Sequence, residues 1–362
     1  MQIFSAGKIF TGNEWLQNHA VVVEDNRIKE IITAASVNKP VQHFPNAFIA
    51  PAFIDLQIYG AGEKLFAVYP EKDALVKLVA YCRSGGAAYC MPTAATHPYE
   101  TFYKCIDTIK DYWNDGGTGI LGLHIEGPWI NAAKRGAHIE SLIHSPAIEQ
   151  VKDLLEYGKG VIKIITLAPE VCSREIIDTI LSYNIVISAG HSNATYKQAT
   201  QAFDNGITTA THLYNAMSPL QHRSPGMVGA VLDHPSAMSS IIPDGHHVDF
   251  AAVRIAKQIM KERLFAITDA VTQTETGYYP HNFAGDKYES MGILSGSALT
   301  MSRAVKNLVT HCGIELSEVL RMCSLYPAQV MKMENELGII KPGATASMVV
   351  MTDTFEVVAV TG

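Results

Sequence analysis

The sequence lacks the features that mark several common classes of protein. Its six cysteines include no Cys-x-x-Cys pair, so a zinc ribbon or a thioredoxin-like redox motif is not expected. No run of about 18 apolar residues is present. The N-terminus also lacks a charged segment followed by a long apolar run, as a signal peptide would have. We therefore expect a cytoplasmic protein with reduced thiols and no membrane partner.

Basic residues do not outnumber acidic ones. The 28 Lys and Arg residues against 35 Asp and Glu residues give a formal net charge of -7. Nothing in this balance indicates nucleic acid or an anionic membrane as a partner. A small anionic substrate stays open, because a few local residues set the field of a binding site. The 48% of hydrophobic residues is ample for a large core.

Apolar strands alternate with helical periodicity over the middle of the chain. The expected strands are residues 48–56, 88–91, 120–123, 161–167, 185–188, 208–211, 238–242 and 264–268. The expected helices are residues 73–83, 99–113, 147–157, 173–182, 196–203 and 250–261. Eight such strands with crossover segments predict an α/β protein with a TIM-like (β/α)₈ barrel. A doubly wound sheet is the alternative, but no Gly-x-Gly-x-x-Gly motif follows the first strand.

Both ends of the chain show short β-like segments. Residues 20–24 and 28–32 predict a hairpin, and so do residues 346–351 and 355–360. We expect these segments to pair, so that residues 1–48 and 335–362 form a small β-sandwich domain and residues 49–334 form the catalytic barrel.

A polar excursion runs from Asp269 to Gly292, and two long helical stretches, 299–312 and 316–333, follow it. The excursion is a candidate for a lid over the C-terminal face of the barrel. A disordered insertion is the alternative interpretation.

Three polar residues lie at the ends of expected strands and form a set of metal ligands. These are Glu126, His191 and His212. Strand ends of a parallel barrel meet at one face, where active sites are built. Two imidazoles and a carboxylate suit Zn²⁺, with Fe²⁺, Co²⁺ or Mn²⁺ as alternatives, and leave a coordination position open for water. Each residue alone is equally a turn or cap residue, but together they predict a catalytic site with one divalent metal.

Further polar residues accompany this set. Asp269 ends the eighth strand, where a carboxylate can take a proton from the attacking water and return it to a leaving amine, although an N-cap role is the alternative. His138, on the loop after the Glu126 strand, is a candidate for stabilising the oxyanion. His124 shares the strand face of Glu126 and is expected to support the site rather than to bind metal.

Two loops offer groups for an anion. Arg223 carries a planar fork of donors that suits a phosphate, and His247 is placed to share the same anion. A solvated loop charge is the alternative interpretation for Arg223.

Taken together, these strings resemble the N-acetylglucosamine-6-phosphate deacetylases of the amidohydrolase superfamily. The matching strings cover nearly the whole chain in order, and the most specific are the Glu-Gly-Pro at residues 126–128 and the Thr-His-Leu-Tyr-Asn-Ala-Met at residues 211–217. The other matches lie at residues 51–55, 134–138, 190–194, 223–226, 244–248, 268–270 and 292–301.

The resemblance implies metal-dependent hydrolysis of the N-acetyl group of N-acetylglucosamine 6-phosphate to glucosamine 6-phosphate and acetate. It implies Glu126, His191 and His212 as ligands and Asp269 as acid and base. It also implies a small-molecule sugar phosphate held by four groups: Asn215, the backbone at Ala216, His138 and His247. Finally, it implies a homodimer in which Arg223 reaches the phosphate of the neighbouring subunit's substrate.

The chain departs from many amidohydrolases at the end of the first barrel strand. Gln57 and Tyr59 stand where a His-x-His pair binds a second metal, and neither is a good zinc ligand. We therefore expect a single catalytic metal. Deacetylation of the galacto epimer stays open, as does a non-catalytic sugar-phosphate binding barrel. A cyclic amidase is disfavoured because Lys163 lies near the start of its strand.

Overall fold

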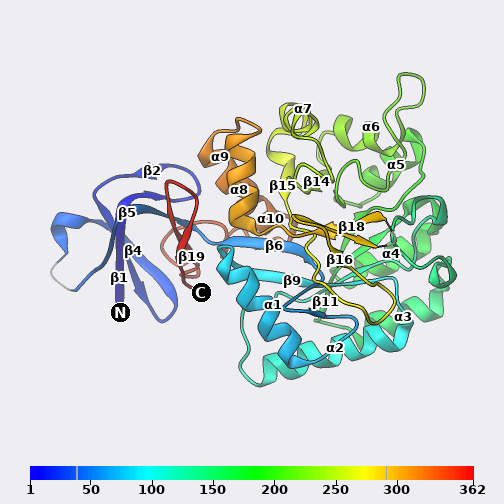
Figure 1. The fold of residues 1–362 in the computed structure, drawn as a ribbon, viewed down its shortest axis with the longest axis horizontal. Helices are drawn as coiled ribbons and strands as arrows, with labels where there is room; N and C mark the ends of the chain where they lie inside the picture. The colour runs from blue at the N-terminus through cyan, green and yellow to red at the C-terminus, as the bar shows by residue number, and fades with distance from the viewer. Residues whose placement is uncertain (38–39, 291) are drawn as a thin grey trace.

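The structure, a computed structural model, describes residues 1–37, 40–290 and 292–362. A small β domain, which contains both chain termini, lies beside a larger barrel (Figure 1). Residues 38–39 of the expected terminal domain and residue 291 of the expected lid lie outside the described residues. Within the described part of the chain, no helix combines the length and the apolar character needed to cross a membrane.

Eight parallel strands form the barrel, and each pairs with the next in chain order. They are β6 (Phe53–Ile58), β9 (Ala87–Ala95), β10 (Leu123–Glu126), β11 (Ile162–Leu167), β12 (Val186–Ala189), β13 (Thr209–Ala210), β14 (Met238–Ile241) and β15 (Leu264–Ala266). Almost every strand residue is buried, as expected of a parallel sheet covered on both faces. The predicted (β/α)₈ barrel is confirmed.

The barrel closes through the residues that follow β15. The backbone N–H of Asp269 donates to the carbonyl of Gln57 at 3.0 Å. The buried carboxylate of Asp55 accepts from the backbone N–H of Thr268 at 3.2 Å and from its hydroxyl at 2.5 Å. Burial raises the pKa of Asp55 to about 7, although the bonds from Thr268 oppose this shift. This closure brings the last strand end, with Asp269, next to the first.

Helices cover the outside of the barrel (Figure 1). They are α1 (Lys72–Ser84), α2 (Tyr99–Asn114), α3 (Ile148–Tyr157), α4 (Arg174–Ser182), α5 (Tyr196–Asp204), α6 (Gly226–Asp233), α7 (Phe250–Met260), α8 (Met301–Thr310), α9 (Leu316–Cys323) and α10 (Leu325–Val330). The sequence did not predict α6, because nearly all its residues are buried and no polar face marks its period. The expected continuous helix over 316–333 is wrong: it breaks at Ser324, because Pro327 has no N–H to donate to the carbonyl of Cys323.

Seven strands from the two chain ends form one sheet, as the predicted small β domain requires. They are β1 (Gln2–Phe10), β2 (Trp15–Leu16), β3 (His19–Glu24), β4 (Arg27–Thr33), β5 (Gln42–Pro51), β19 (Met348–Thr352) and β20 (Val357–Val360). The segment before β19 also reaches β4, because Ile28 donates to Ala344 at 2.9 Å and accepts from Gly343 at 2.8 Å. The sheet therefore curls around an apolar core of its own. The domain boundaries stay a prediction.

The polar excursion is folded rather than a disordered insertion. Its strands β16 (Asn282–Phe283), β17 (Lys287–Ser290) and β18 (Ile293–Ser297) form a small antiparallel sheet. Asp286 on its turn contacts His246 of the barrel at 2.9 Å. We call residues 271–297 the lid segment. A second small hairpin, β7 (Gly60–Ala61) with β8 (Lys64–Leu65), follows β6.

Candidate metal centre and active site

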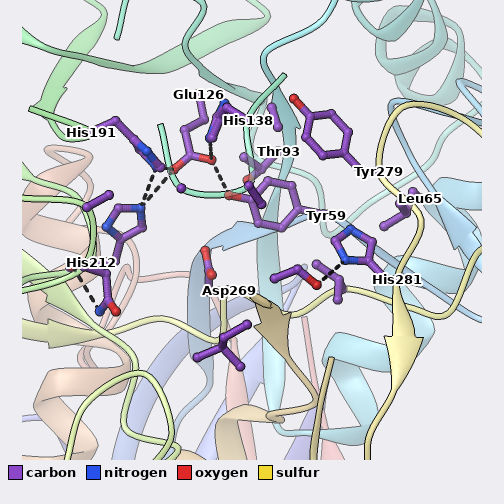
Figure 2. Close-up of a pocket in the computed structure, with 18 of the residues that line it drawn as sticks. Tyr59, Leu65, Thr93, Glu126, His138, His191, His212, Asp269, Tyr279 and His281 are labelled. Carbon is purple, nitrogen blue, oxygen red and sulfur yellow. Dashed lines mark hydrogen bonds and ion pairs between the residues drawn. The ribbon is translucent and has the colours of Figure 1, made fainter. Parts of the chain in front are cut away.

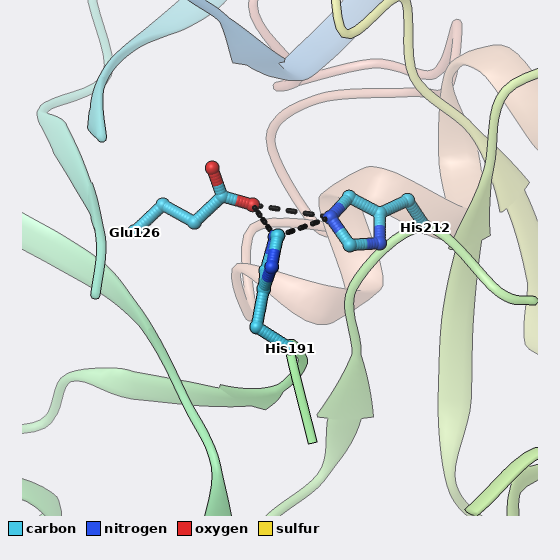
Figure 3. Close-up of side chains that lie close together, drawn as sticks. All are labelled: Glu126, His191 and His212. Atoms are coloured by element: carbon cyan, nitrogen blue, oxygen red, sulfur yellow. Dashed lines mark hydrogen bonds and ion pairs between the residues drawn. The ribbon is translucent and has the colours of Figure 1, made fainter. Parts of the chain in front are cut away.

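Three side chains from three strand ends converge on one point (Figure 3). Glu126 is the last residue of β10, while His191 and His212 lie two residues beyond β12 and β13. Oε1 of Glu126 lies 3.2 Å from Nε2 of His191 and 3.1 Å from Nε2 of His212, and the two nitrogens are 3.1 Å apart. All three side chains are buried, and they form the group that could hold a metal in the described part of the chain.

The dimensions of this triangle fit a divalent metal. Ligand atoms at about 2.0–2.1 Å from a tetrahedral zinc lie about 3.3 Å from one another. The Nδ1 atom of His191 lies 2.9 Å from the carbonyl of Lys134, so Nδ1 carries the proton and Nε2 presents a lone pair to the centre. The Nδ1 atom of His212 is buried without a partner among the described residues. A carboxylate oxygen and imidazole nitrogens therefore face one another at ligand spacing.

The charges of the cluster support an ionised carboxylate. Burial alone would raise the pKa of Glu126. The neighbouring imidazoles of His191, His138 and His212 outweigh this, so the pKa lies well below its ordinary value. An anionic oxygen at this point is what a hard or borderline divalent cation requires.

The backbone is strained where it presents these groups. His191, His212 and Asp269 have φ angles of 48°, 38° and 54°, in the left-handed region that side chains seldom adopt. Each such residue costs about 1–3 kcal/mol, and strain of this kind clusters at functional sites. Three strained residues at three strand ends around one cluster therefore support a functional role.

Glu170 fixes the loop that carries His191, and the sequence analysis missed it. Its carboxylate accepts from the hydroxyl of Ser192 and the backbone N–H of Asn193, each at 2.6 Å, and from the side chain of Asn131 at 3.0 Å. Glu170 follows the end of β11, so its place at the same barrel face was a signal available in the sequence.

Asp269 lies beside the ligand cluster in a buried position. Its Oδ1 accepts a hydrogen bond of 2.7 Å from Nε2 of Gln57, which also lies 3.1 Å from Oε1 of Glu126. Burial raises the pKa of Asp269 and the charge of Glu126 adds to the shift, while His212 opposes it. A carboxylate with a raised pKa is a better proton acceptor near neutral pH.

His138 presents an N–H to the same space. Its Nδ1 accepts from the backbone N–H of Thr96 at 3.3 Å and lies 2.7 Å from the hydroxyl of Thr96. The proton of the neutral ring is therefore on Nε2, which lies 3.3 Å from Oε2 of Glu126. Burial lowers the pKa of His138 to about 4, so the ring is a neutral donor. Thr96 was not foreseen from the sequence.

His124 lies in the barrel interior rather than at the ligand cluster. Its Nε2 lies 2.7 Å from the hydroxyl of Thr166, and its Nδ1 lies 3.1 Å from the carbonyl of Leu56. Burial lowers its pKa to about 4. These bonds place His124 away from the ligand positions, and its supporting role stays a prediction.

A cavity of about 240 Å³ opens over the cluster (Figure 2). Its wall includes the residues expected to act on or hold a substrate: Glu126, His138, His191, His212, Asn215, Ala216, His247 and Asp269. The lid segment adds Tyr279 and His281, which the sequence analysis had not assigned. Arg223 does not line this cavity. It is exposed on the loop 221–224.

Asp244 holds His247 in place. One carboxylate oxygen lies 2.6 Å from Nδ1 of His247, and the other accepts from the backbone N–H groups of His246 and His247 at 2.9 and 2.8 Å. Burial would raise the pKa of Asp244, but the bonds from His247 lower it below its ordinary value. Nδ1 of His247 is therefore hydrogen-bonded to Asp244, so Nε2 is the ring nitrogen available to a molecule in the cavity.

Gln57 and Tyr59 both contact the carboxylate of Glu126. The hydroxyl of Tyr59 donates a short hydrogen bond to Oε2 of Glu126 (Figure 2). Burial, together with the charges of Asp269 and Glu126, holds the pKa of Tyr59 well above its usual range, so the hydroxyl keeps its proton.

A barrel with a Glu-His-His cluster and an aspartate at its last strand end is the arrangement of a metal-dependent hydrolase. The profile of the Amidohydrolase family matches residues 48–362, and the NagA composite domain profile matches residues 1–44. The chain belongs to the amidohydrolase family.

Within this family the chain is similar to amino-sugar-phosphate deacetylases. It is 32% identical to an N-acetylglucosamine-6-phosphate deacetylase of Haemophilus influenzae, with 97% of this chain and 95% of the relative covered. It is 31% identical to an N-acetylgalactosamine-6-phosphate deacetylase of Escherichia coli O157:H7, with 96% and 94% covered.

Solved structures of such deacetylases have the same fold as this chain. The N-acetylglucosamine-6-phosphate deacetylase of Pasteurella multocida superposes with a TM-score of 0.95 at 33% identity, over 99% of this chain and 97% of that one. A variant of the Mycobacterium smegmatis enzyme in complex with N-acetyl-D-glucosamine-6-phosphate gives a TM-score of 0.92 at 26% identity, over 99% and 97%.

Proposed function

We propose that this protein hydrolyses the N-acetyl group of N-acetylglucosamine 6-phosphate, giving glucosamine 6-phosphate and acetate in amino-sugar metabolism. The observation that carries the proposal is the triangle of Glu126, His191 and His212 opening on one cavity that Asp269 and His138 also line. The near full-length similarity to deacetylases supports the same reaction.

We propose that one divalent metal, Zn²⁺ in preference to Fe²⁺, Co²⁺ or Mn²⁺, binds to Glu126, His191 and His212. When bound there, such a metal lowers the pKa of a water molecule and polarises a carbonyl. A second ion is disfavoured, because the amide of Gln57 lies between the carboxylate oxygens of Glu126 and Asp269 that would have to bind it.

The protein's own groups handle the protons and the developing charge. Asp269 accepts a proton as water attacks the acetyl carbonyl. The Nε2–H of His138 donates to the carbonyl oxygen as that oxygen gains negative charge. Asp269 then returns the proton to the amine nitrogen as the C–N bond breaks, because an amine leaves poorly without an acid.

Binding groups surround this centre. Asn215, the backbone at Ala216 and His247 line the cavity and are proposed to hold the sugar and its phosphate. Arg223 is exposed and away from the cavity of its own subunit. This position suits the proposed homodimer, in which Arg223 reaches the phosphate bound by the partner subunit.

Acetate release tests the proposal. Zinc-loaded protein is given N-acetylglucosamine 6-phosphate, the unphosphorylated sugar or the galacto epimer. Fast release from the gluco 6-phosphate alone supports the proposal. Faster release from the galacto 6-phosphate would transfer the assignment to the epimer, for which the 31% identical relative gives a reason. Binding without any release would favour a sugar-phosphate binding barrel.

A further inference from the structure

Tyr59 is neither a proposed metal ligand nor the proposed acid and base, yet its hydroxyl contacts one of the proposed ligands. Its hydroxyl donates to Oε2 of Glu126, while Oε1 of the same carboxylate faces His191 and His212 at 3.2 and 3.1 Å. The two carboxylate oxygens therefore have separate partners. One faces the proposed metal, and the other is tied to the phenol.

A free carboxylate would not keep this orientation. The terminal torsion of a glutamate is broad, so rotation can exchange the two oxygens or turn both toward a cation. Gln57 contacts Oε1 at 3.1 Å from one side, and His138 approaches Oε2 at 3.3 Å. The O–H of Tyr59 donates a charge-assisted hydrogen bond to Oε2, whereas Nε2 of His138 lies beyond the usual hydrogen-bond distance, so the Tyr59 bond sets the rotation.

The phenol also affects His138. Its Nε2–H is the donor proposed to meet the substrate's carbonyl oxygen, and Oε2 of Glu126 competes for that donor. Because Tyr59 already donates to Oε2, His138 is left with a longer contact of 3.3 Å and remains available to the cavity.

We propose that Tyr59 is a positioning residue that fixes Glu126 as a one-oxygen ligand and leaves His138 free for substrate. The inference rests on the proposed metal site. Partners that orient ligands in this way typically change metal affinity by 10–100-fold when they are removed.

The decisive variant is Tyr59→Phe, which deletes the hydroxyl that donates to Glu126 and accepts from Nε2 of Gln57 at 2.8 Å. The zinc dissociation constant is measured by competition with a chromophoric chelator, and we expect it to rise by about 10-fold or more. Replacement of zinc by Co²⁺ gives a second readout, because its visible absorption depends on coordination number. We expect the Co²⁺ spectrum of the variant to change as the second carboxylate oxygen enters the coordination shell.

Tyr279→Phe is the matched control. It deletes a phenol hydroxyl in the same cavity whose bond, at 2.6 Å, goes to the backbone carbonyl of Thr96 rather than to Glu126. We expect its zinc affinity and its Co²⁺ spectrum to match those of the unmodified protein. 4-Aminophenylalanine at position 59 restores an N–H donor on the same ring, and we expect it to recover most of the lost affinity.

The outcomes separate the two proposals. If the unmodified protein binds no zinc, the metal site fails and the role of Tyr59 fails with it. If the unmodified protein binds zinc but Tyr59→Phe leaves both affinity and spectrum unchanged, only the role of Tyr59 is overturned. If Tyr59→Phe does not fold, the zinc affinity of the protein with 4-aminophenylalanine at position 59 is measured instead. Zinc affinity far below that of the unmodified protein would then count against a role for the donor.

Discussion

The side-chain amide of Gln57 donates to Oδ1 of Asp269 at 2.7 Å, joining the first strand of the barrel to the residues after the last. Asp269 is thereby held beside Glu126 in a buried position, with a raised pKa caused by burial and by the charge of Glu126. The proposed base is therefore oriented by a residue 212 positions away along the chain.

Asp269→Asn tests the proposed base. The amide keeps the shape of the side chain but cannot accept the proton, so we expect the turnover number to fall by about 10²–10⁴-fold. Zinc content, measured by atomic absorption, is expected to stay near that of the unmodified protein, because Asp269 is not in the ligand triangle. Near-normal turnover in the variant would remove Asp269 from the mechanism.

Removal of the metal tests the ligand triangle. Prolonged dialysis against a chelator should abolish acetate release, and added Zn²⁺ should restore it. Because the metal binds only the folded state, loading to 100 times the dissociation constant is expected to raise the free energy of unfolding by about 2.7 kcal/mol. Thermal unfolding with and without metal measures this. In His191→Ala, added zinc should neither restore acetate release nor raise the melting temperature. If zinc leaves the melting temperature of the unmodified protein unchanged, the proposed metal site is contradicted.

A subunit-mixing experiment tests whether Arg223 acts across a dimer. Arg223→Ala alone should raise KM for the 6-phosphate while leaving the unphosphorylated sugar unaffected. When Arg223→Ala and Asp269→Asn subunits are unfolded together and reassembled at equal amounts, half of the dimers are mixed. Each mixed dimer has one site with an intact base and the partner's Arg223, so about one quarter of normal activity should return.

The controls for this mixing are the two variants reassembled separately, which should stay at their own low activities. If Arg223 serves its own subunit, the mixture should show no more activity than the average of the two variants. A monomer by sedimentation would also exclude the shared site.

The buried carboxyl of Asp55 predicts a pH-dependent stability. Its pKa is about 7 in the folded state, against about 4 in an unfolded chain, with burial as the main cause. Because the folded pKa is raised, this contribution to stability is complete below about pH 4 and is lost as the pH rises through 7. Between pH 5 and pH 8 the loss is about 2–3 kcal/mol for this one group.

Asp55→Asn removes that titration. Urea unfolding at pH 5 and pH 8 gives the change in unfolding free energy for each protein. The difference between the two proteins is the contribution of the Asp55 titration to that change. We expect the unmodified protein to lose about 2–3 kcal/mol more than the variant over this interval. An equal loss in both would show that Asp55 has an ordinary pKa.

Local patterns were sufficient for much of the architecture. Alternating apolar strands and helical periodicities reflect the burial of each element, so the barrel and the β domain built from both chain ends could be predicted. The strand-end positions of Glu126, His191 and His212 placed three polar side chains at one face, since parallel strands end together. Their role as ligands stays a prediction, as does the catalytic role of Asp269.

Other features have no local signal. Helix α6 is buried nearly all round, so no amphipathic period marks it. The sequence alone cannot tell which nitrogen of His138 carries the proton, because that depends on Thr96, 42 residues away.

The sequence by itself determined the order of the elements and the residues available at the barrel's C-terminal face, because burial patterns and strand ends are local properties. Only the tertiary structure decided that Gln57 bridges Glu126 and Asp269 and that Tyr59 holds the second carboxylate oxygen. Gln57 reaches Asp269 because closure of the barrel brings the first strand end against the last. Gln57 and Tyr59 reach Glu126 because the ends of parallel strands meet at one face of the barrel, and no local pattern encodes these distances.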